Sequence, residues 1–344
     1  MNVTKVLEEK RLVAENFQIV PVDSSNVRYV SAVFRSVYSN DFPVKDVYDP
    51  DILWREISAG RVSAALAFDR QGQPAGYVSM FKNAPNSRLW EAGNMVIHPA
   101  FKYSNLSSLL TKIYFNPTVI GLTDYSGIFC EAVCHHYVTQ IGAIKSGLYD
   151  CALALSQLSG ASFKEQRALT SPRVSCVMSF LENSEPITPV YVPTEYAGVV
   201  RDLTQPLKPR TFLPADASLP MAGLTIREEK YYAAAQTWKI AVMEIGADWQ
   251  TCLDELLHEA ADRKVISLQI AVNTALPALG AAVRAMRDRG FFLGGLLPHW
   301  FGSDGLMLQK LLETEPDYEQ IKLYSKTAKD LLAFIRADRE AVNS

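Results

Sequence analysis

The sequence lacks features that define several large classes of protein. Its 344 residues include 34 Lys and Arg against 37 Asp and Glu, so the basic excess typical of nucleic-acid binders is missing. No apolar run approaches the ~20 residues that a membrane-spanning helix needs. The first residues, MNVTKVLEEKRLVAEN, are charged throughout and lack the apolar core of a secretory signal. We therefore expect a soluble, cytoplasmic protein that binds neither nucleic acid nor membranes.

Cysteine is also scarce, and the five residues form an odd number, which predicts reduced thiols. Cys130 and Cys134, followed by two histidines, resemble a metal cluster. In a strand these two cysteines would lie ~13 Å apart, and no second ligand pair is nearby in the sequence. The sequence therefore predicts small buried residues rather than a metal site.

Length and proline distribution predict two domains. The chain is long enough for about two domains of ~150 residues. Residues 183–220 hold seven of the 18 prolines, so this segment cannot be one regular element and is interpreted as a connector that contains a short helix at 196–203. The predicted division is an N-terminal domain (1–182), the connector (183–220), a reduced domain (221–317) and a helical tail (318–344).

Both domains have the patterns of mixed α and β structure, mostly antiparallel. Before the connector, strands are predicted at 17–22, 61–83 (a hairpin), 88–99, 127–133, 148–158 and 173–183, and helices at 27–38, 52–57, 104–116 and 138–147. After it, strands are predicted at 231–246, 265–272, 291–301 and 305–313, and helices at 248–263 and 275–290.

The two halves also align with each other. EAV at 131–133 matches IAV at 270–272, an offset of 139 residues, and KSGLYDCALAL at 145–155 matches DRGFFLGGLLP at 288–298, an offset of 143. The change of offset is about one helical turn. We therefore predict a tandem repeat of a strand–helix–Gly–strand unit.

A strand that runs into a polar loop and a helix, at residues 95–110, is the segment most suited to a ligand. The first turn of a helix exposes unpaired N–H groups and the positive end of its dipole, which suits a pyrophosphate. Lys102 adds a cation. Many capped helices after a strand bind nothing, so the pattern alone leaves both interpretations open.

This segment resembles the GCN5-related N-acetyltransferase superfamily. Its fourth strand commonly reads L-x-V-x-P-x-Y, followed by Arg/Gln-x-x-Gly-x-Gly/Ala. Met95, Ile97, Pro99 and Phe101 match the first part. In the loop that follows, Asn and Ser replace both glycines; Asn tolerates a positive φ, which would keep the shape of the loop.

Two further stretches resemble a two-domain branch of that superfamily. Its fifth strand and next helix read roughly E-A-V-T-x-H-x-x-S-Q, and residues 131–140 here read EAVCHHYVTQ. The second half of that branch ends in G-F-F-x-x-G-x-L-P, and residues 290–298 read GFFLGGLLP. The resemblance spans about residues 17–315 and implies an acyl-CoA N-acyltransferase fold in tandem.

The resemblance implies that acetyl-CoA or another acyl-CoA binds in the first half, with a small-molecule amine as acceptor and no metal. Glu91 and Glu131 are candidate bases, Tyr137 is a candidate general acid, and His136 is a candidate for either a base or a substrate contact. The candidate catalytic residues are Glu91, Glu131, Tyr137 and His136. The candidate cofactor-binding residues are Met95, Val96, Ile97, Lys102, Tyr103, Ser104, Asn105, Leu106 and Ser107.

Several alternatives stay open at this point. The second half lacks a recognisable phosphate loop and is expected to be non-catalytic. The whole chain can instead be a non-catalytic acyl-CoA-binding or regulatory module, or a scaffold that docks through its 318–342 helix; a homodimer is also possible. Left-handed Asn105 with converging amides would favour CoA binding. His98 is expected to be structural, and His258 and His299 are expected on the surface.

Overall fold

The computed structural model describes residues 16–40, 42, 44–116, 124–163, 171–312 and 314–344, so all but the last residue of the N-terminal stretch MNVTKVLEEKRLVAEN lies outside the described residues. The chain forms two compact units, the first up to Asn83 and over Trp90–Cys130, the second over Ala84–Leu89 and Glu131–Ser344. The boundary falls inside strand β5 (Gly127–Val133), whereas the sequence placed a connector at 183–220.

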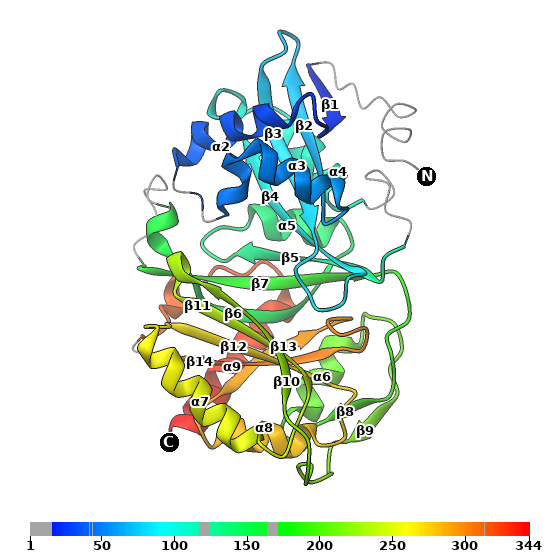
Figure 1. Cartoon of the computed structure of the whole chain (residues 1–344), viewed down its shortest axis with the longest axis vertical. Helices are drawn as coiled ribbons and strands as arrows, with labels where there is room; N and C mark the ends of the chain where they lie inside the picture. The colour runs from blue at the N-terminus through cyan, green and yellow to red at the C-terminus, as the bar shows by residue number, and fades with distance from the viewer. Residues whose placement is uncertain (1–15, 41, 43, 117–123, 164–170, 313) are drawn as a thin grey trace. The chain divides into compact units, whose positions relative to one another are not determined.

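The first unit is built on an antiparallel sheet in the order β1-β2-β3-β4 (Figure 1). The strands are β1 (Phe17–Pro21), β2 (Val62–Asp69), β3 (Pro74–Phe81) and β4 (Leu89–Ile97). The helices are α2 (Val30–Tyr38), α3 (Pro50–Ser58) and α4 (Leu106–Tyr114), with short 3-10 turns at η1 (Val27–Tyr29), η2 (Lys45–Tyr48) and η3 (Pro99–Phe101). Each of these strands and α-helices was predicted from the sequence.

Helices cover both faces of this sheet, as two neighbouring residues of β3 demonstrate. Successive residues of a strand point to opposite faces. The ring of Tyr77 meets that of Phe34 in α2, with centroids 5.3 Å apart. A Cβ on Gly76 would lie 2.9 Å from Leu110 and 3.2 Å from Leu106, both in α4. Gly76 therefore allows α4 to pack directly on the sheet, on the face opposite α2.

The second unit contains a larger sheet in the order β7-β6-β13-β14-β12-β11-β10. The strands are β6 (Tyr149–Ser159), β7 (Arg173–Glu182), β10 (Ile226–Tyr232), β11 (Thr237–Glu244), β12 (Ser267–Asn273), β13 (Phe292–Leu297) and β14 (Gly305–Leu311). The helices are α5 (Val138–Lys145), α6 (Ala197–Thr204), α7 (Trp249–Asp262), α8 (Leu279–Arg287) and α9 (Lys326–Asn343), with turns η4 (Gly160–Phe163), η5 (Thr194–Tyr196), η6 (Ala233–Ala235) and η7 (Tyr318–Gln320).

The predicted repeat is confirmed by the order of the elements. Along the chain, β5-α5-β6-β7 recurs as β12-α8-β13-β14, and in both copies the last strand is inserted beside the first, giving β5-β7-β6 and β12-β14-β13. The glycines that close the two helices, Gly147 and Gly290, both have positive φ, 89° and 78°. A bulge also recurs: Cys151 is the extra residue in β6 and Gly294 in β13, 143 residues apart.

Segment 183–220 differs from the predicted connector because it packs into the core of the second unit. It contains two short parallel strands, β8 (Val190–Val192) and β9 (Phe212–Pro214), which the sequence did not predict, and the helix α6, which it did. Buried side chains of this segment include Val190, Tyr196 and Val200. The domain boundaries, which length and proline distribution predict, do not coincide with the compact units and stay a prediction.

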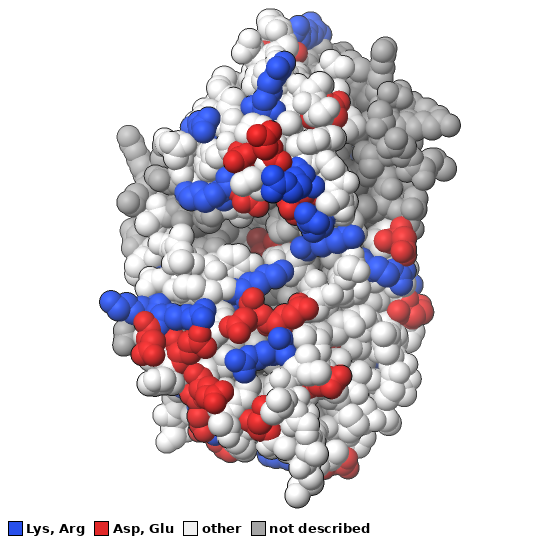
Figure 2. All heavy atoms as spheres, viewed as in Figure 1, with Lys and Arg blue, Asp and Glu red and all other residues white. Residues whose placement is uncertain are grey.

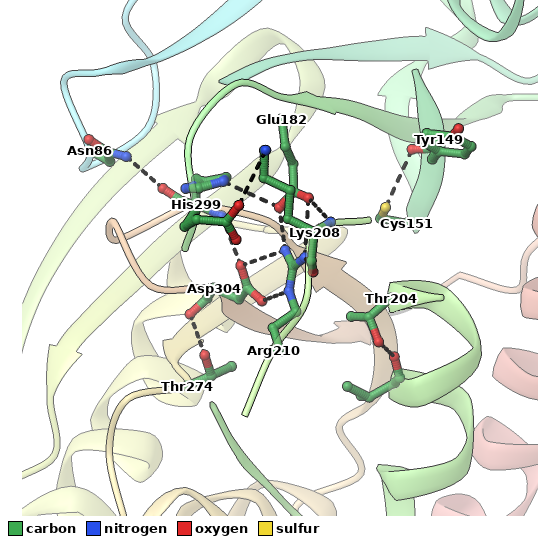
Figure 3. A network of polar contacts seen from close by, with 12 residues as sticks. Asn86, Tyr149, Cys151, Glu182, Thr204, Lys208, Arg210, Thr274, His299 and Asp304 are labelled. Atoms are coloured by element: carbon green, nitrogen blue, oxygen red, sulfur yellow. Dashed lines mark hydrogen bonds and ion pairs between the residues drawn. The ribbon is translucent and has the colours of Figure 1, made fainter. Parts of the chain in front are cut away.

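A buried ionic cluster ties this segment to the sheet (Figure 3). Arg210 contacts Glu182 at the end of β7 and, at 2.8 Å, Asp304 just before β14. The Arg210 and Asp304 side chains are fully buried, and His299 Nε2 lies 3.2 Å from Glu182. The prediction that His299 lies on the surface is wrong: its side chain is 1% exposed, because its turn folds inward onto Glu182.

Candidate functional site

A bulge in β4 lies within the predicted acyl-CoA segment. Tyr77 pairs with Val96 and Ser79 with Gly93, so Val78 alone faces both Asn94 and Met95. Asn94 has a φ of 61°, a conformation that Asn tolerates better than other non-glycine residues. Bulges are over-represented next to active sites, where they interrupt pairing and redirect side chains. The bulge places an irregular, half-buried backbone at the position where the sequence predicts the thioester and pantetheine arm.

Glu91 lies on the same strand, three residues before the bulged position. Its side chain is 8% exposed, and Asn83 Nδ2 donates a 2.6 Å hydrogen bond to its Oε2. A buried carboxylate needs such donors because its charge is costly to remove from water. The two residues belong to neighbouring strands, since Asn83 follows the end of β3 and Glu91 faces Phe81 across the β3–β4 pair. The structure therefore supplies a held carboxylate in the first unit.

The loop between β4 and α4 differs from a ready phosphate cradle. The backbone amides of Lys102, Ser104 and Leu106 already donate, to Pro99 O, Phe101 O and Ser104 Oγ. Asn105 has a φ of −75°, so its backbone is not left-handed. A left-handed Asn105 would have kept the shape that glycine gives to the phosphate loop of the family. Three of the predicted donors are therefore occupied within the loop itself.

The remaining side chains of this loop face solvent or pack locally. Tyr103 is 96% exposed, and Lys102 Nζ lies 6.0 Å from the centre of its ring. Thr111 in α4 approaches Met95, with Oγ1 3.9 Å from the sulfur. His98 Nδ1 accepts a hydrogen bond from the amide of Ala100, in agreement with the structural role expected for it.

Glu131 belongs to the second unit and is engaged by two partners. Lys239 Nζ in β11 lies 2.5 Å from its Oε1, and Gln157 Nε2 donates to its Oε2. The carboxylate side chain is 11% exposed. Lys239 belongs to the second repeat. Its ion pair with Glu131 explains, without any catalytic role, why a carboxylate lies in an apolar strand.

His136 and Tyr137 also belong to the second unit, at the start of α5. The amide of Val138 donates to His136 Nδ1 at 3.3 Å, so this nitrogen carries a lone pair and, in the neutral ring, the proton is on Nε2. Burial, followed by the neighbouring His135 and Lys322, lowers the pKa of His136 to about 4. At neutral pH its Nε2 is therefore a hydrogen-bond donor rather than a base. Tyr137 is 44% exposed.

The second repeat also has a bulge in its equivalent of β4, because Ile226 pairs with Glu244 and Arg227 with Val242 across β10 and β11. Its equivalent of β4 is β11, which pairs in parallel with β12 without interruption from Thr237–Ser267 to Val242–Val272. Side chains of β12 such as Ile270 and Val272 are fully buried.

Other features restrict what the described residues can do. Within the described ranges, no group of three or more His, Cys, Asp or Glu is arranged to hold a metal ion. On the face shown in Figure 2, Lys and Arg side chains alternate with Asp and Glu rather than forming a patch of one sign. No helix in the described part of the chain is long and apolar enough to cross a membrane.

The C-terminal helix α9 does not offer the free docking face that the scaffold hypothesis needs. Its apolar residues Ala328, Leu331 and Ile335 are buried, and the helix packs on both β6 and β13. Its Asp338 accepts hydrogen bonds from the hydroxyl of Tyr196 and the amide of Leu293. The helix therefore belongs to the core of the second unit.

No protein-family model and no curated protein sequence matches the chain. Solved structures that it resembles include the spermidine/spermine N-acetyltransferase SpeG of Vibrio cholerae (9% identity, 49% of this chain, 93% of that chain, TM-score 0.38). Others are the ribosomal-protein-S5-alanine acetyltransferase of Vibrio fischeri (10%, 49%, 94%, 0.37) and YncA of Salmonella typhimurium with acetyl-CoA (12%, 51%, 98%, 0.38). Each of these structures corresponds to about half of this chain.

Proposed function

We propose that the chain is an acyl-CoA-dependent N-acyltransferase, which moves an acetyl or other acyl group from CoA to the amine of a small molecule. The observation that carries the proposal is the bulge at Asn94 and Met95 in β4, because it frees backbone groups from the β3 ladder beside a buried carboxylate. Such groups can bind the thioester carbonyl and the pantetheine arm, and a fixed backbone donor can stabilise the oxyanion that forms there.

The proposed reaction begins with a neutral amine, because a protonated amine has no lone pair. The amine nitrogen attacks the thioester carbonyl carbon, and the carbonyl oxygen takes the negative charge. Glu91 accepts the amine proton, directly or through a water molecule. The carbon–sulfur bond then breaks, and the CoA thiolate takes up a proton from solvent. We assign Glu91 the role of base over Glu131 because Glu131 is already paired with Lys239.

CoA is proposed to bind along Met95–Ile97, with its pyrophosphate near Lys102 and the start of α4. The second repeat is proposed to be non-catalytic because its sequence has no recognisable phosphate loop. A second candidate function is a non-catalytic acyl-CoA-binding module. It is favoured by one observation: the amides of Lys102, Ser104 and Leu106 already have acceptors within the loop.

Two measurements test the proposal. A thermal-shift screen with CoA, acetyl-CoA and longer acyl-CoAs detects binding, since a ligand at 100 times its Kd adds about 2.7 kcal/mol to the free energy of unfolding. Thiol release from acetyl-CoA is then followed with a panel of amines. Glu91→Gln should lower the rate and leave the Kd for acetyl-CoA nearly unchanged. Glu56→Gln, a surface carboxylate of the same unit paired with Arg61, is the control.

The outcomes separate the two candidates. Binding with thiol release that Glu91→Gln lowers and Glu56→Gln does not supports the enzyme. Binding without release from any amine supports the module. An absence of binding for every acyl-CoA contradicts both.

A further inference from the structure

The second unit contains a cleft beside the C-terminal part of α9. Its volume is about 760 Å³, which is within the range of small-molecule binding sites. The residues that line it come from the turn at Gly290 and the start of β13, from the end of β14 and the segment directly after it, and from the last turns of α9. All of these elements belong to the second unit.

Lys310 of β14 brings a half-buried ammonium group to this cleft. Its Nζ donates a 2.5 Å hydrogen bond to the carbonyl oxygen of Arg289. Among the residues that the structure describes, no carboxylate pairs with it. An ammonium group has three donors, so two of them are left for a ligand. Burial lowers the pKa of Lys310, as expected for a cation that is partly removed from water without a compensating negative charge.

Gly290 leaves the space that this ammonium group occupies. Its φ is 78°. A Cβ at this position would lie 2.7 Å from Lys310 Nζ and 3.5 Å from Asn343 Oδ1. The side chains of a β14 residue and an α9 residue therefore converge at the glycine, on the wall of the cleft.

Arg339 of α9 supplies a second cation. Its side chain is 14% exposed, and its Cζ lies 5.9 Å from the centre of the Phe292 ring. Glu315 pairs with the guanidinium at 2.7 Å, but the Glu315 side chain is 80% exposed. An exposed partner contributes little to an ion pair and can be exchanged for another carboxylate. The guanidinium is thus held against the ring and already faces a carboxylate.

The walls of the cleft favour one kind of anion. Glu315 and Glu340 line it together with the two cations, so its charged side chains carry two positive and two negative charges. A multiply charged phosphate would meet two like charges at short range, whereas a single carboxylate would meet fewer repulsions and can replace Glu315 at Arg339. Leu311 and Phe292 add apolar surface, on which a hydrocarbon tail can pack.

We propose that this cleft is a binding site for a small monocarboxylic acid, whose carboxylate pairs with Lys310 and Arg339 and whose apolar tail packs on Leu311 and Phe292. The site shares no residue with the segment proposed to bind acyl-CoA, and the proposal does not rest on acyltransferase activity. It gives the second repeat, which is proposed to be non-catalytic, a binding function of its own.

Isothermal titration of the full chain with straight-chain carboxylates from propionate to hexanoate tests the site. We expect saturable binding that tightens as the tail lengthens, because each added methylene buries apolar surface. Lys310→Met removes the charge and keeps the length of the side chain, so the Kd for hexanoate should rise about tenfold or more. Lys326→Met is the matched control, because Lys326 is an exposed residue at the other end of α9 and pairs with Asp330. Near-UV circular dichroism checks that each variant is folded.

A third variant tests the exchange at Arg339. Glu315→Gln removes the carboxylate that competes with the ligand, so the Kd for hexanoate should fall. A Kd that stays the same or rises would contradict a ligand carboxylate at Arg339. Inorganic phosphate and hexylamine are the comparison probes, and either of them binding more tightly than hexanoate overturns the assignment to a monocarboxylic acid.

The results decide this proposal separately from the proposed function. No binding of any carboxylate, or an equal Kd in Lys310→Met and the parent chain, overturns the site. Hexanoate that bound only at the acyl-CoA segment would be insensitive to Lys310→Met, so it would give the second of these results. If Lys310→Met weakens hexanoate binding but no acyl-CoA binds, the cleft stands and the acyltransferase function fails.

Discussion

Ala152 and Gly295, which are equivalent residues of the two repeats, pair with each other where β6 meets β13. The offset of 143 residues that relates them also relates the bulged residues Cys151 and Gly294. Because the pair is antiparallel, the two repeats are related by a local twofold axis at this point. Both residues are small, which allows the two backbones to meet closely. The two repeats, whose sequences are only weakly similar, are thus related by symmetry where β6 pairs with β13.

The first prediction concerns Gly295, whose φ is 135°. A Cβ there would lie 2.4 Å from Cys151 O and 2.5 Å from Ala152 Cα, so it would meet backbone rather than a flexible side chain. Gly295→Ala should lower the free energy of unfolding by about 2–4 kcal/mol. Gly198→Ala, in α6 with open space around it, should be neutral or raise it by up to about 1 kcal/mol. Urea unfolding of both variants measures this; equal effects would contradict the close approach.

The second prediction concerns Arg210, which is fully buried between Glu182 and Asp304. Arg210→Met removes the shared partner of two buried carboxylates. The free energy of unfolding should fall by about 3–5 kcal/mol, because breaking a buried pair leaves charge without compensation. Arg336→Met removes an exposed pair with Glu340 and should cost less than about 1 kcal/mol. Denaturant melts of the two variants compare these costs, and a small loss in Arg210→Met would mean that the cluster is not a unit.

The third prediction concerns the pH dependence of the same cluster. Burial raises the pKa of Glu182, but hydrogen bonds from His299 and Arg210 and the charge of Arg210 outweigh it and bring the pKa to about 2. The folded state therefore holds this carboxylate ionised where the unfolded chain, with a pKa near 4.5, binds a proton. The stabilisation is complete above about pH 4.5 and is lost as the pH falls toward 2.

Unfolding of the parent chain and of Glu182→Gln over this range checks the prediction. The parent should be more stable than the variant at pH 6, and the difference should shrink steadily below about pH 4.5. A difference that is constant with pH would show that the loss in the variant comes from packing rather than from the charge.

The sequence predicts those features of the structure that are determined by residues close together in the chain, and it does not predict contacts between distant residues. Strands such as β4 and helices such as α5 carry their own periodicity and end signals, and Gly147 closes α5 as expected. The repeat was visible because equivalent turns keep their glycines. The Arg210 cluster was not predicted, because its partners are 28 and 94 residues away in the chain and no local pattern connects them. Segment 183–220 was interpreted as a connector because prolines mark irregular backbone but do not reveal whether it is buried.

In the candidate site, too, the features set by consecutive residues were predicted and those set by distant residues were not. The polar loop before α4 was found because strand, loop and helix are consecutive. The bulge at Asn94 was not, although an Asn inside a strand pattern is a weak signal for a left-handed residue. The partner of Glu131 could not be predicted either, because Lys239 lies 108 residues away, in the other repeat. The tautomer of His136 follows from one backbone amide and needs the structure.

The fourth prediction separates a structural Glu131 from a catalytic one. Its ion pair with Lys239 has side chains 11% and 19% exposed, so it is largely removed from water. In a double-mutant cycle with Glu131→Gln and Lys239→Met, the coupling in the free energy of unfolding should be about 1 kcal/mol or more. Both single variants should keep the thiol-release rate of the parent under conditions where they are folded. A rate that falls in Glu131→Gln alone, with no coupling, would restore Glu131 as the base.

The last prediction concerns Lys102, the cation beside the start of α4. If the pyrophosphate of acyl-CoA binds there, Lys102→Ala removes a charge-assisted hydrogen bond, and the Kd should rise about tenfold, or about 1.4 kcal/mol. The loss should shrink as salt is added, because screening weakens an exposed charge. Lys112→Ala is the matched control, because Lys112 is in the last turn of the same helix, away from the loop. Isothermal titration with acetyl-CoA at two salt concentrations measures both. A Lys102→Ala variant that binds as tightly as Lys112→Ala would place the phosphates elsewhere, a result that the occupied amides of Lys102, Ser104 and Leu106 would then explain.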